Sequence, residues 1–320
     1  MSHQAHDHRF WSCLKDENLL RRASECNQCD ECKLDEADFL GRSRMGGMHV
    51  HLRILFVDGS VWLARLLLNA PPLKWLESVV IPAPKVHDYG LRNGPGNDVG
   101  AAFMLIDELP GRAFSQLGGS KTQREKHPFE RIGSLTLNPR GKPTIGPIVG
   151  DRTGTLAYLG LFNNRKVYYT SRAQEYLSLI SSGQLFSRYR VNAYVIFKRL
   201  ERLAINGLNP FDPELNNGPF FLKHMDDKGD HIFVDEEFNI TGIIDWSFAC
   251  IVPAYEAIGP SLVTAKMGDI YNDVKAVSED DELLAEEVHT KGGSDLARFA
   301  FDQAECDVSS LLTRYFGALQ

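Results

Sequence analysis

Hydrophobic residues alternate with polar ones in short runs along the first third of the chain. In residues 50–56 the hydrophobic side chains fall at every second position, which predicts a half-buried β-strand. The pair Asp58-Gly59 is typical of a tight hairpin turn, and residues 61–68 provide the returning strand. Two further strand-like segments, KVHDYG and AAFMLIDELPG, flank the loop LRNGPGND. The pattern predicts a small antiparallel β-rich region over residues 46–108.

The hydrophobic spacing becomes helical beyond a hinge at Asp107–Leu109. Residues 171–180 and 191–205 repeat with the period of an amphipathic helix. Two strand-like segments, HIFVD and ITGIIDW, are joined by the tight turn EEFN, and helical spacing returns in residues 282–289 and 296–315. The sequence therefore predicts an α+β fold with two lobes, in which the β-rich N-lobe precedes a larger, mainly helical C-lobe over residues 109–320.

Residues 1–45 are predicted to form an amino-terminal extension with a helix over residues 10–23. It also contains Cys26, Cys29 and Cys32, whose spacing resembles part of a metal-binding run. An iron–sulfur run would place a fourth cysteine at the position of Glu36, and three ligands rarely close a metal site. Two interpretations stay open: a mobile polar arm with three thiols, or a zinc module completed by Cys13 or an early histidine.

The overall composition is that of a globular protein. The chain has 320 residues, of which 43% are hydrophobic and 24% are charged. Its formal net charge of −7 and its scattered basic residues do not favour nucleic acid as a partner. The chain shows neither the apolar core of a signal peptide nor a run of membrane-spanning length. We therefore expect a cytoplasmic protein with its cysteines as thiols, while the oligomeric state stays unknown.

Carboxylates gather at both ends of the strand–turn–strand segment 221–246. Asp226 precedes the first strand and Asp245 follows the second, so an antiparallel hairpin would bring the two ends together. Two converging carboxylates can hold a divalent cation, or one can hold it while the other orients a hydroxyl. Phosphoryl transfer needs both tasks. Acidic loop residues usually face solvent, but Asp245 lies in an apolar stretch where an unpaired carboxylate is costly to bury.

The segment HMDDKGDHIFVDEEFNITGIIDW resembles the catalytic segment of the aminoglycoside phosphotransferase and choline kinase-like family, notably its fungal members. The resemblance implies a protein-kinase-like two-lobe fold, with Asp226 as the catalytic base and Asp245 as the main Mg²⁺ ligand. ATP and Mg²⁺ are then the implied cofactors, and the implied partner is a small molecule with a hydroxyl group. More weakly, MLIDELPG resembles the hinge of this family, where the backbone of Asp107 and Leu109 would contact adenine.

The metal-binding position departs from the family pattern. His231 stands where the family usually has Asn. An imidazole nitrogen suits softer cations than an amide oxygen does, so Mn²⁺ is an alternative to Mg²⁺. Three alternatives stay open for His231: a metal ligand, a hydrogen-bond partner of Asp226, or a partly exposed loop residue, with Asp230 as a replacement ligand.

The nucleotide-binding positions depart as well. Arg65, in SVWLAR, stands where the family strand carries Lys; it would hold the ATP phosphates or else form a surface salt bridge. Glu77 is the candidate acidic partner of Arg65 in an unusually short helical stretch. Gly46 and Gly47 are candidates for a phosphate-binding loop, although a glycine pair is more often a simple turn.

The sequence thus predicts an ATP-dependent phosphotransferase that acts on a small-molecule hydroxyl. The same departures motivate an alternative, namely a catalytically impaired pseudokinase or binding module on the same scaffold. The short helical stretch that contains Glu77, and the short, glycine-interrupted linker GRAFSQLGGSKTQREKHPF after the hinge, could also reflect an incomplete gene model.

Overall fold

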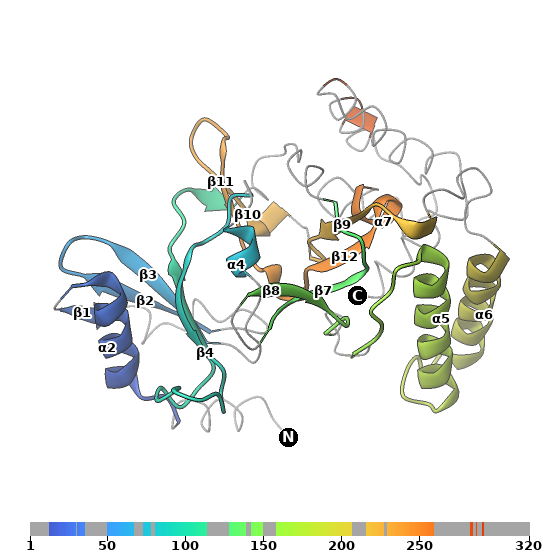
Figure 1. The fold of residues 1–320 in the computed structure, drawn as a ribbon, viewed down its shortest axis with the longest axis horizontal. Helices are drawn as coiled ribbons and strands as arrows, with labels where there is room; N and C mark the ends of the chain where they lie inside the picture. Colours follow the sequence, from blue (N-terminus) through green and yellow to red (C-terminus); the bar gives the residue numbers. More distant parts are fainter. Residues whose placement is uncertain are drawn as a thin grey trace. The chain divides into compact units, whose positions relative to one another are not determined.

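The computed structural model describes most of the chain between residues 13 and 258. The described residues are 13–29, 31–35, 50–66, 73–77, 81–113, 128–138, 142–149, 158–206, 216–226, 229–258, 282, 283, 286 and 290. The chain divides into two compact units: unit 1 is Met1–Arg112 with Phe233–Ser247, and unit 2 is Ala113–Ile232 with Phe248–Gln320. Antiparallel sheets and helices occur together, so the predicted α+β class is confirmed (Figure 1).

Unit 1 is built on a five-stranded antiparallel sheet with the order β1-β2-β3-β5-β4. Its strands are β1 (Cys32–Leu34), β2 (Val50–Phe56), β3 (Val61–Leu66), β4 (Val86–Gly90) and β5 (Phe103–Asp107). The predicted first hairpin is confirmed, because β2 pairs with β3 from Val50 opposite Leu66 to Leu55 opposite Val61. A short helix, α4 (Leu73–Leu76), lies between β3 and β4 in the chain.

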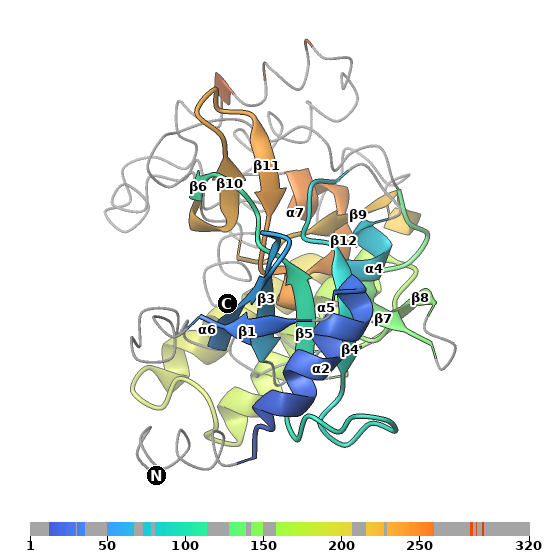
Figure 2. The same ribbon diagram turned by 90° about the vertical axis from the view of Figure 1, so that its left-hand side faces the viewer.

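Helix α2 (Asp16–Asn27) covers one face of this sheet (Figure 2). Leu19 and Ala23 are fully buried in one cluster with side chains from β2, β3 and β5, which include Ile54, Ala64 and Leu105. The helix expected at residues 10–23 is therefore present but begins later. The interpretation of this part of the chain as a mobile polar arm is wrong for α2 and β1, because their apolar side chains complete the core of unit 1.

A three-stranded sheet has the order β11-β10-β6, with β6 (Arg112–Ala113), β10 (Ile232–Val234) and β11 (Ile240–Ile243). The predicted second hairpin is confirmed. The Asp235 N–H donates to the Asn239 carbonyl at 3.0 Å, and the Asn239 N–H donates to Asp235 Oδ1 at 2.8 Å. These bonds close the turn between β10 and β11, so the strand register is set locally.

Unit 2 contains a four-stranded antiparallel sheet with the order β8-β7-β12-β9. Its strands are β7 (Gly133–Leu137), β8 (Pro143–Gly146), β9 (Phe220–Lys223) and β12 (Cys250–Pro253). Helices α5 (Arg165–Ser181) and α6 (Arg190–Asn206) pack against each other and match the two helices predicted from hydrophobic spacing. Helix α7 (Ala254–Ile258) follows β12 directly.

A buried polar cluster joins α5 to α7 within unit 2. Arg172 Nη1 donates to the Tyr168 hydroxyl at 2.5 Å and lies 3.3 Å from Glu256 Oε1. All three residues are buried, and burial raises the pKa of Tyr168 well above its usual range. Helices predicted at residues 282–289 and 296–315 lie almost wholly outside the described residues. In the described part of the chain, no helix combines the length and apolar character of a membrane span.

Candidate functional site

Asp226 is placed by the end of strand β9. This strand is buried along its whole length and pairs with β12, with Lys223 opposite Cys250. His224 follows the strand and is buried, with its ring centroid 5.6 Å from that of His231. Asp226 itself is only 8% exposed, so this carboxylate is not a solvent-facing loop residue.

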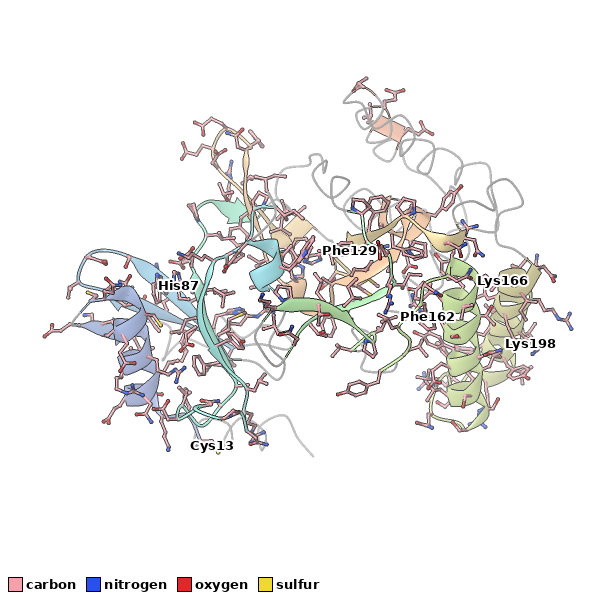
Figure 3. All side chains as sticks on the ribbon, viewed as in Figure 1. Cys13, His87, Phe129, Phe162, Lys166 and Lys198 are labelled. Atoms are coloured by element: carbon pink, nitrogen blue, oxygen red, sulfur yellow. The ribbon has the colours of Figure 1, made fainter. Side chains whose placement is uncertain are left out.

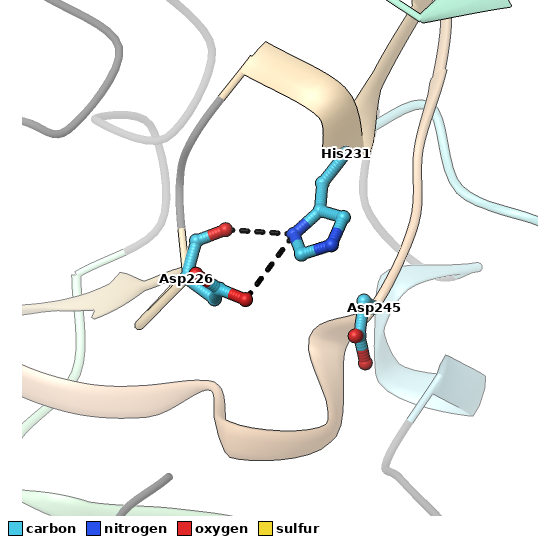
Figure 4. A group of neighbouring side chains, drawn as sticks. All are labelled: Asp226, His231 and Asp245. Atoms are coloured by element: carbon cyan, nitrogen blue, oxygen red, sulfur yellow. Dashed lines mark hydrogen bonds and ion pairs between the residues drawn. The ribbon is translucent and has the colours of Figure 1, made fainter. Parts of the chain in front are cut away.

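His231 lies directly beside Asp226 (Figure 4). It ends the single turn η5 (Gly229–His231) and precedes β10. Its Nδ1 atom is 2.8 Å from the main-chain oxygen of Asp226 and 3.8 Å from the side-chain Oδ2. A main-chain oxygen can only accept, so Nδ1 carries the hydrogen in this contact. In the neutral ring, Nε2 then has the lone pair that a metal ion requires.

Asp245 is held at a bend after strand β11. Its φ angle is +59°, in the left-handed region that Asp adopts more readily than most residues. The next residue, Trp246, is fully buried, and its Nε1–H donates to the Ile243 carbonyl at 2.7 Å. The Ile243 N–H in turn donates to the Pro82 carbonyl at 2.9 Å. These contacts hold the residues before and after Asp245 in place.

Asp226, His231 and Asp245 form the one group of possible metal ligands found among the described residues. One ligand atom from each lies within 4.8 Å of the others. A divalent cation bound by oxygen and nitrogen at about 2.0–2.6 Å fits donors at this separation. The donor set, two carboxylates and one imidazole, therefore suits a hard or borderline divalent cation.

Arg65 forms an ion pair with Asp245 in unit 1. It lies on β3, which pairs with β2 on one side and β5 on the other, and the residue is 3% exposed. One of its terminal nitrogens, Nη2, contacts Asp245 Oδ1. The alternative of a surface salt bridge at a strand edge is therefore wrong. The role of Arg65 in holding phosphates stays a prediction.

The other predicted nucleotide-binding residues have structural contacts of their own. Glu77 Oε1 accepts a hydrogen bond from the Val86 N–H at 2.6 Å, and its pairing with Arg65 stays a prediction. Asp107 ends β5, and its Oδ1 lies 2.6 Å from Nε2 of His87, which is labelled in Figure 3. Leu109 is half-buried and packs directly over Gly242. Gly46 and Gly47 lie outside the described residues.

Sequence reasoning missed an ion-pair network on the hinge. Arg53, on β2, donates to Glu108 Oε2 at 2.7 Å through Nη2 and at 3.1 Å through Nε. Its Nη1 donates to Asp35 Oδ2 at 3.1 Å. The network links the end of β1 to the residue after β5. Only the acidic character of Glu108 in the hinge motif could have suggested it.

The cysteine cluster does not assemble as a three-ligand site in the described residues. Cys32 Sγ lies 3.2 Å from the Ser24 hydroxyl and 3.3 Å from the Leu20 carbonyl, so this thiol packs against α2. Cys29 Sγ lies 3.7 Å from the Glu31 carbonyl. Cys26 is exposed on α2, and the three residues are free cysteines. The zinc-module interpretation is therefore unsupported by this geometry.

Comparison with known proteins gives one curated relative and several similar folds. No protein-family model matches the chain. Clavilactone A biosynthesis cluster protein Y of Ampulloclitocybe clavipes is 28% identical over 216 residues, which is 58% of this chain and 50% of that protein. The chain thus spans about half the length of the curated relative that it matches.

The similar solved structures carry the names of phosphotransferases and kinases. Aminoglycoside phosphotransferase APH(4)-Ia has a TM-score of 0.49 and 12% identity, with 92% of this chain and 88% of that chain covered. A putative fructosamine-3-kinase from Thermobifida fusca has a TM-score of 0.45 and 14% identity, covering 92% and 98%. Plasmodium vivax ethanolamine kinase has a TM-score of 0.45 and 11% identity, covering 89% and 73%.

Proposed function

We propose that this chain is an ATP-dependent phosphotransferase that acts on a hydroxyl group of a small molecule. The observation that carries the proposal is the grouping of Asp226, His231 and Asp245 within 4.8 Å. Phosphoryl transfer is accelerated mainly by positioning and by neutralising phosphate charge. A buried carboxylate beside a set of metal ligands is suited to both tasks.

Asp245 and His231 are the residues that would hold the divalent cation. Asp245 offers a hard oxygen ligand, and His231 offers Nε2, because Nδ1 faces the main-chain oxygen of Asp226. An ion in this site would supply positive charge to the phosphates of ATP. The nitrogen ligand suits Mn²⁺ better than Mg²⁺, and both cations belong to the proposal.

Asp226 is the proposed base. Its carboxylate is buried beside His231, and a base of this kind must lie within hydrogen-bond reach of the hydroxyl that it orients or deprotonates. The acceptor hydroxyl would therefore approach Asp226, while the cation is held by Asp245 and His231. The proposal therefore gives the two carboxylates separate tasks: Asp226 is buried beside His231, whereas Asp245 pairs with Arg65.

The nucleotide would lie against the face of the unit 1 sheet that bears Arg65. Strand alternation places Leu63 and Arg65 on this face, whereas Trp62 and Ala64 belong to the core cluster under α2. Arg65 would fork hydrogen bonds onto phosphate oxygens.

The adenine ring would lie at the hinge. The Asp107 side chain is hydrogen-bonded to His87, so Asp107 and Leu109 would contact adenine through their backbone. The proposed nucleotide contacts also include Gly46, Gly47 and Glu77. The proposal further includes a cytoplasmic location.

The proposal is tested by Asp226→Asn. We expect ATP turnover with Mn²⁺ or Mg²⁺, measured over a panel of amino-alcohols and aminosugars, to fall by about 10²–10⁴-fold, the usual contribution of a general base. Nucleotide binding, read from the shift in melting temperature, should persist. Glu236→Gln is the matched control, because Glu236 is an exposed carboxylate in the turn of the same segment. Undiminished turnover in Asp226→Asn would refute the role of this carboxylate.

A binding module without catalysis is the second candidate function. The ion pair between Arg65 and Asp245 favours it, because this contact joins the proposed phosphate ligand to the proposed metal ligand. At 100 times Kd a ligand adds about 2.7 kcal/mol of stability. A clear thermal shift with ATP and metal but no turnover of any acceptor would support this candidate over the enzyme.

A further inference from the structure

The ion pair between Arg65 and Asp245 occupies the residue that the proposed function assigns to the metal. Both residues belong to unit 1. The Arg65 side chain is 4% exposed and the Asp245 side chain is 24% exposed, so the guanidinium is nearly dehydrated in this contact. A buried charge is stable only with a partner, and Asp245 provides one for Arg65.

A divalent cation and this guanidinium make opposing demands on the same carboxylate. A cation that binds Asp245 either shares the carboxylate with Arg65, which places like charges side by side, or displaces the guanidinium from a buried partner. Either route lowers the affinity of the chain for metal alone. Arg65 would therefore act as a positioning residue toward the metal site, in addition to any contact with nucleotide.

We infer that Arg65 and a divalent cation compete for Asp245, so that metal binds weakly without nucleotide and the two ligands bind cooperatively. The inference rests on the proposed function and concerns the regulation of the same site. Phosphate oxygens are strong bidentate partners for guanidinium, so nucleotide can take Arg65 away from Asp245. Thermodynamic reciprocity then requires that metal raise nucleotide affinity by the same factor.

The geometry of Asp245 is compatible with such an exchange. It lies at a bend with φ of +59°, after the end of β11, and its side chain keeps partial access to solvent. Arg65 lies within a β-strand whose register with β2 and β5 is continuous on both sides. The movable partner is therefore Asp245 or the tip of the arginine side chain, not the strand.

The experiment measures the binding of Mn²⁺ alone to the full chain, by isothermal titration or by the electron paramagnetic resonance of free Mn²⁺. Arg65→Gln should bind Mn²⁺ at least about tenfold more tightly than the wild type, since a charge-assisted hydrogen bond contributes about 1.5–3 kcal/mol. Arg65→Met, which preserves volume in a buried position, should do the same. Arg65→Lys retains the charge and should stay near the wild-type affinity.

Arg53→Gln is the matched control. Arg53 is a half-buried arginine on the neighbouring strand β2, and it pairs with Glu108 instead of Asp245. Its Mn²⁺ affinity should equal that of the wild type. Equal affinity in wild type, Arg65→Gln and Arg65→Met would overturn the inference, as would an equal gain in Arg53→Gln. If Asp245→Asn weakens Mn²⁺ binding while the Arg65 variants have no effect, the metal site stands and only the competition fails. If no folded variant binds Mn²⁺ at all, the proposed metal site and this inference both fail.

Discussion

The Nδ1 atom of His231 lies 2.8 Å from the main-chain oxygen of Asp226. This contact sets the orientation of the ring. A carbonyl oxygen can only accept a hydrogen bond, so the nitrogen that faces it, Nδ1, must carry the hydrogen. The proposed function uses this orientation, because it directs Nδ1 to Asp226 and assigns Nε2 to the cation. The ring would present Nε2 where an amide would present its oxygen.

Substitution of His231 tests whether that nitrogen selects the cation. We predict that His231→Asn lowers the ratio of Mn²⁺ affinity to Mg²⁺ affinity, because an amide oxygen replaces an imidazole nitrogen. His231→Ala should weaken the binding of both cations. Metal titrations on the two variants and the wild type give the ratio. An unchanged ratio in His231→Asn would mean that the ring does not bind the cation.

Leu19 tests the contribution of helix α2 to the stability of unit 1. The residue is fully buried against the sheet, so Leu19→Ala should lower the free energy of unfolding by about 2–5 kcal/mol. Arg21→Ala, on the exposed side of the same helix, should lower it far less than Leu19→Ala does, because the ion pairs of Arg21 are exposed to solvent. Urea denaturation of the two variants measures the difference. Equal losses would show that α2 is not part of the core.

The parts of the fold that sequence reasoning predicted are those with local causes. The turn at Asp58-Gly59 and the turn from Asp235 to Asn239 are closed by contacts between near neighbours, so strand alternation and turn residues were enough to predict both hairpins. The placement of α2 depends on the packing of Leu19 and Ala23 against the sheet, whose strands lie elsewhere in the sequence. A polar segment of this kind therefore looked like an arm.

The candidate site shows the same difference between local contacts and contacts that are distant in sequence. Asp226, His231 and Asp245 could be grouped from one short segment and its hairpin. The contact between Arg65 and Asp245 joins residues 180 positions apart, and Arg53 contacts Glu108 across 55 positions. Such pairs depend on the packing of the whole unit and leave no local pattern in the sequence. They were available only from the fold.

From the buried thiol of Cys250 we predict that the free energy of unfolding falls at alkaline pH. Burial raises its pKa to about 12 from an ordinary value of 9.0. The folded chain therefore binds the thiol proton more tightly than the unfolded chain, and this stabilisation, complete below pH 9.0, is lost progressively as the pH rises toward 12. Urea denaturation at pH 8 and at pH 10.5 should show the decline. Cys250→Ala should reduce the slope in this window, and an unchanged slope would assign the decline to other groups, such as Tyr168 and Tyr169, whose pKa values burial also raises.

Gly111 lies where the hinge passes strand β10, and we predict that no residue other than glycine fits there without a loss of stability. Its φ is +98°, and an added Cβ would lie 2.3 Å from the main-chain oxygen of Val234. Gly59 has a similar φ of +86° with nothing within 4 Å of its Cβ position, so it provides a control with the same backbone strain and no collision. Gly59→Ala should therefore cost about 1–2 kcal/mol of stability from the left-handed conformation alone. Gly111→Ala should cost about 1–3 kcal/mol more, because the methyl group overpacks against the strand. Urea denaturation of both variants measures this difference. If the two variants lose the same stability, the hinge does not pass Val234 as closely as the structure places it.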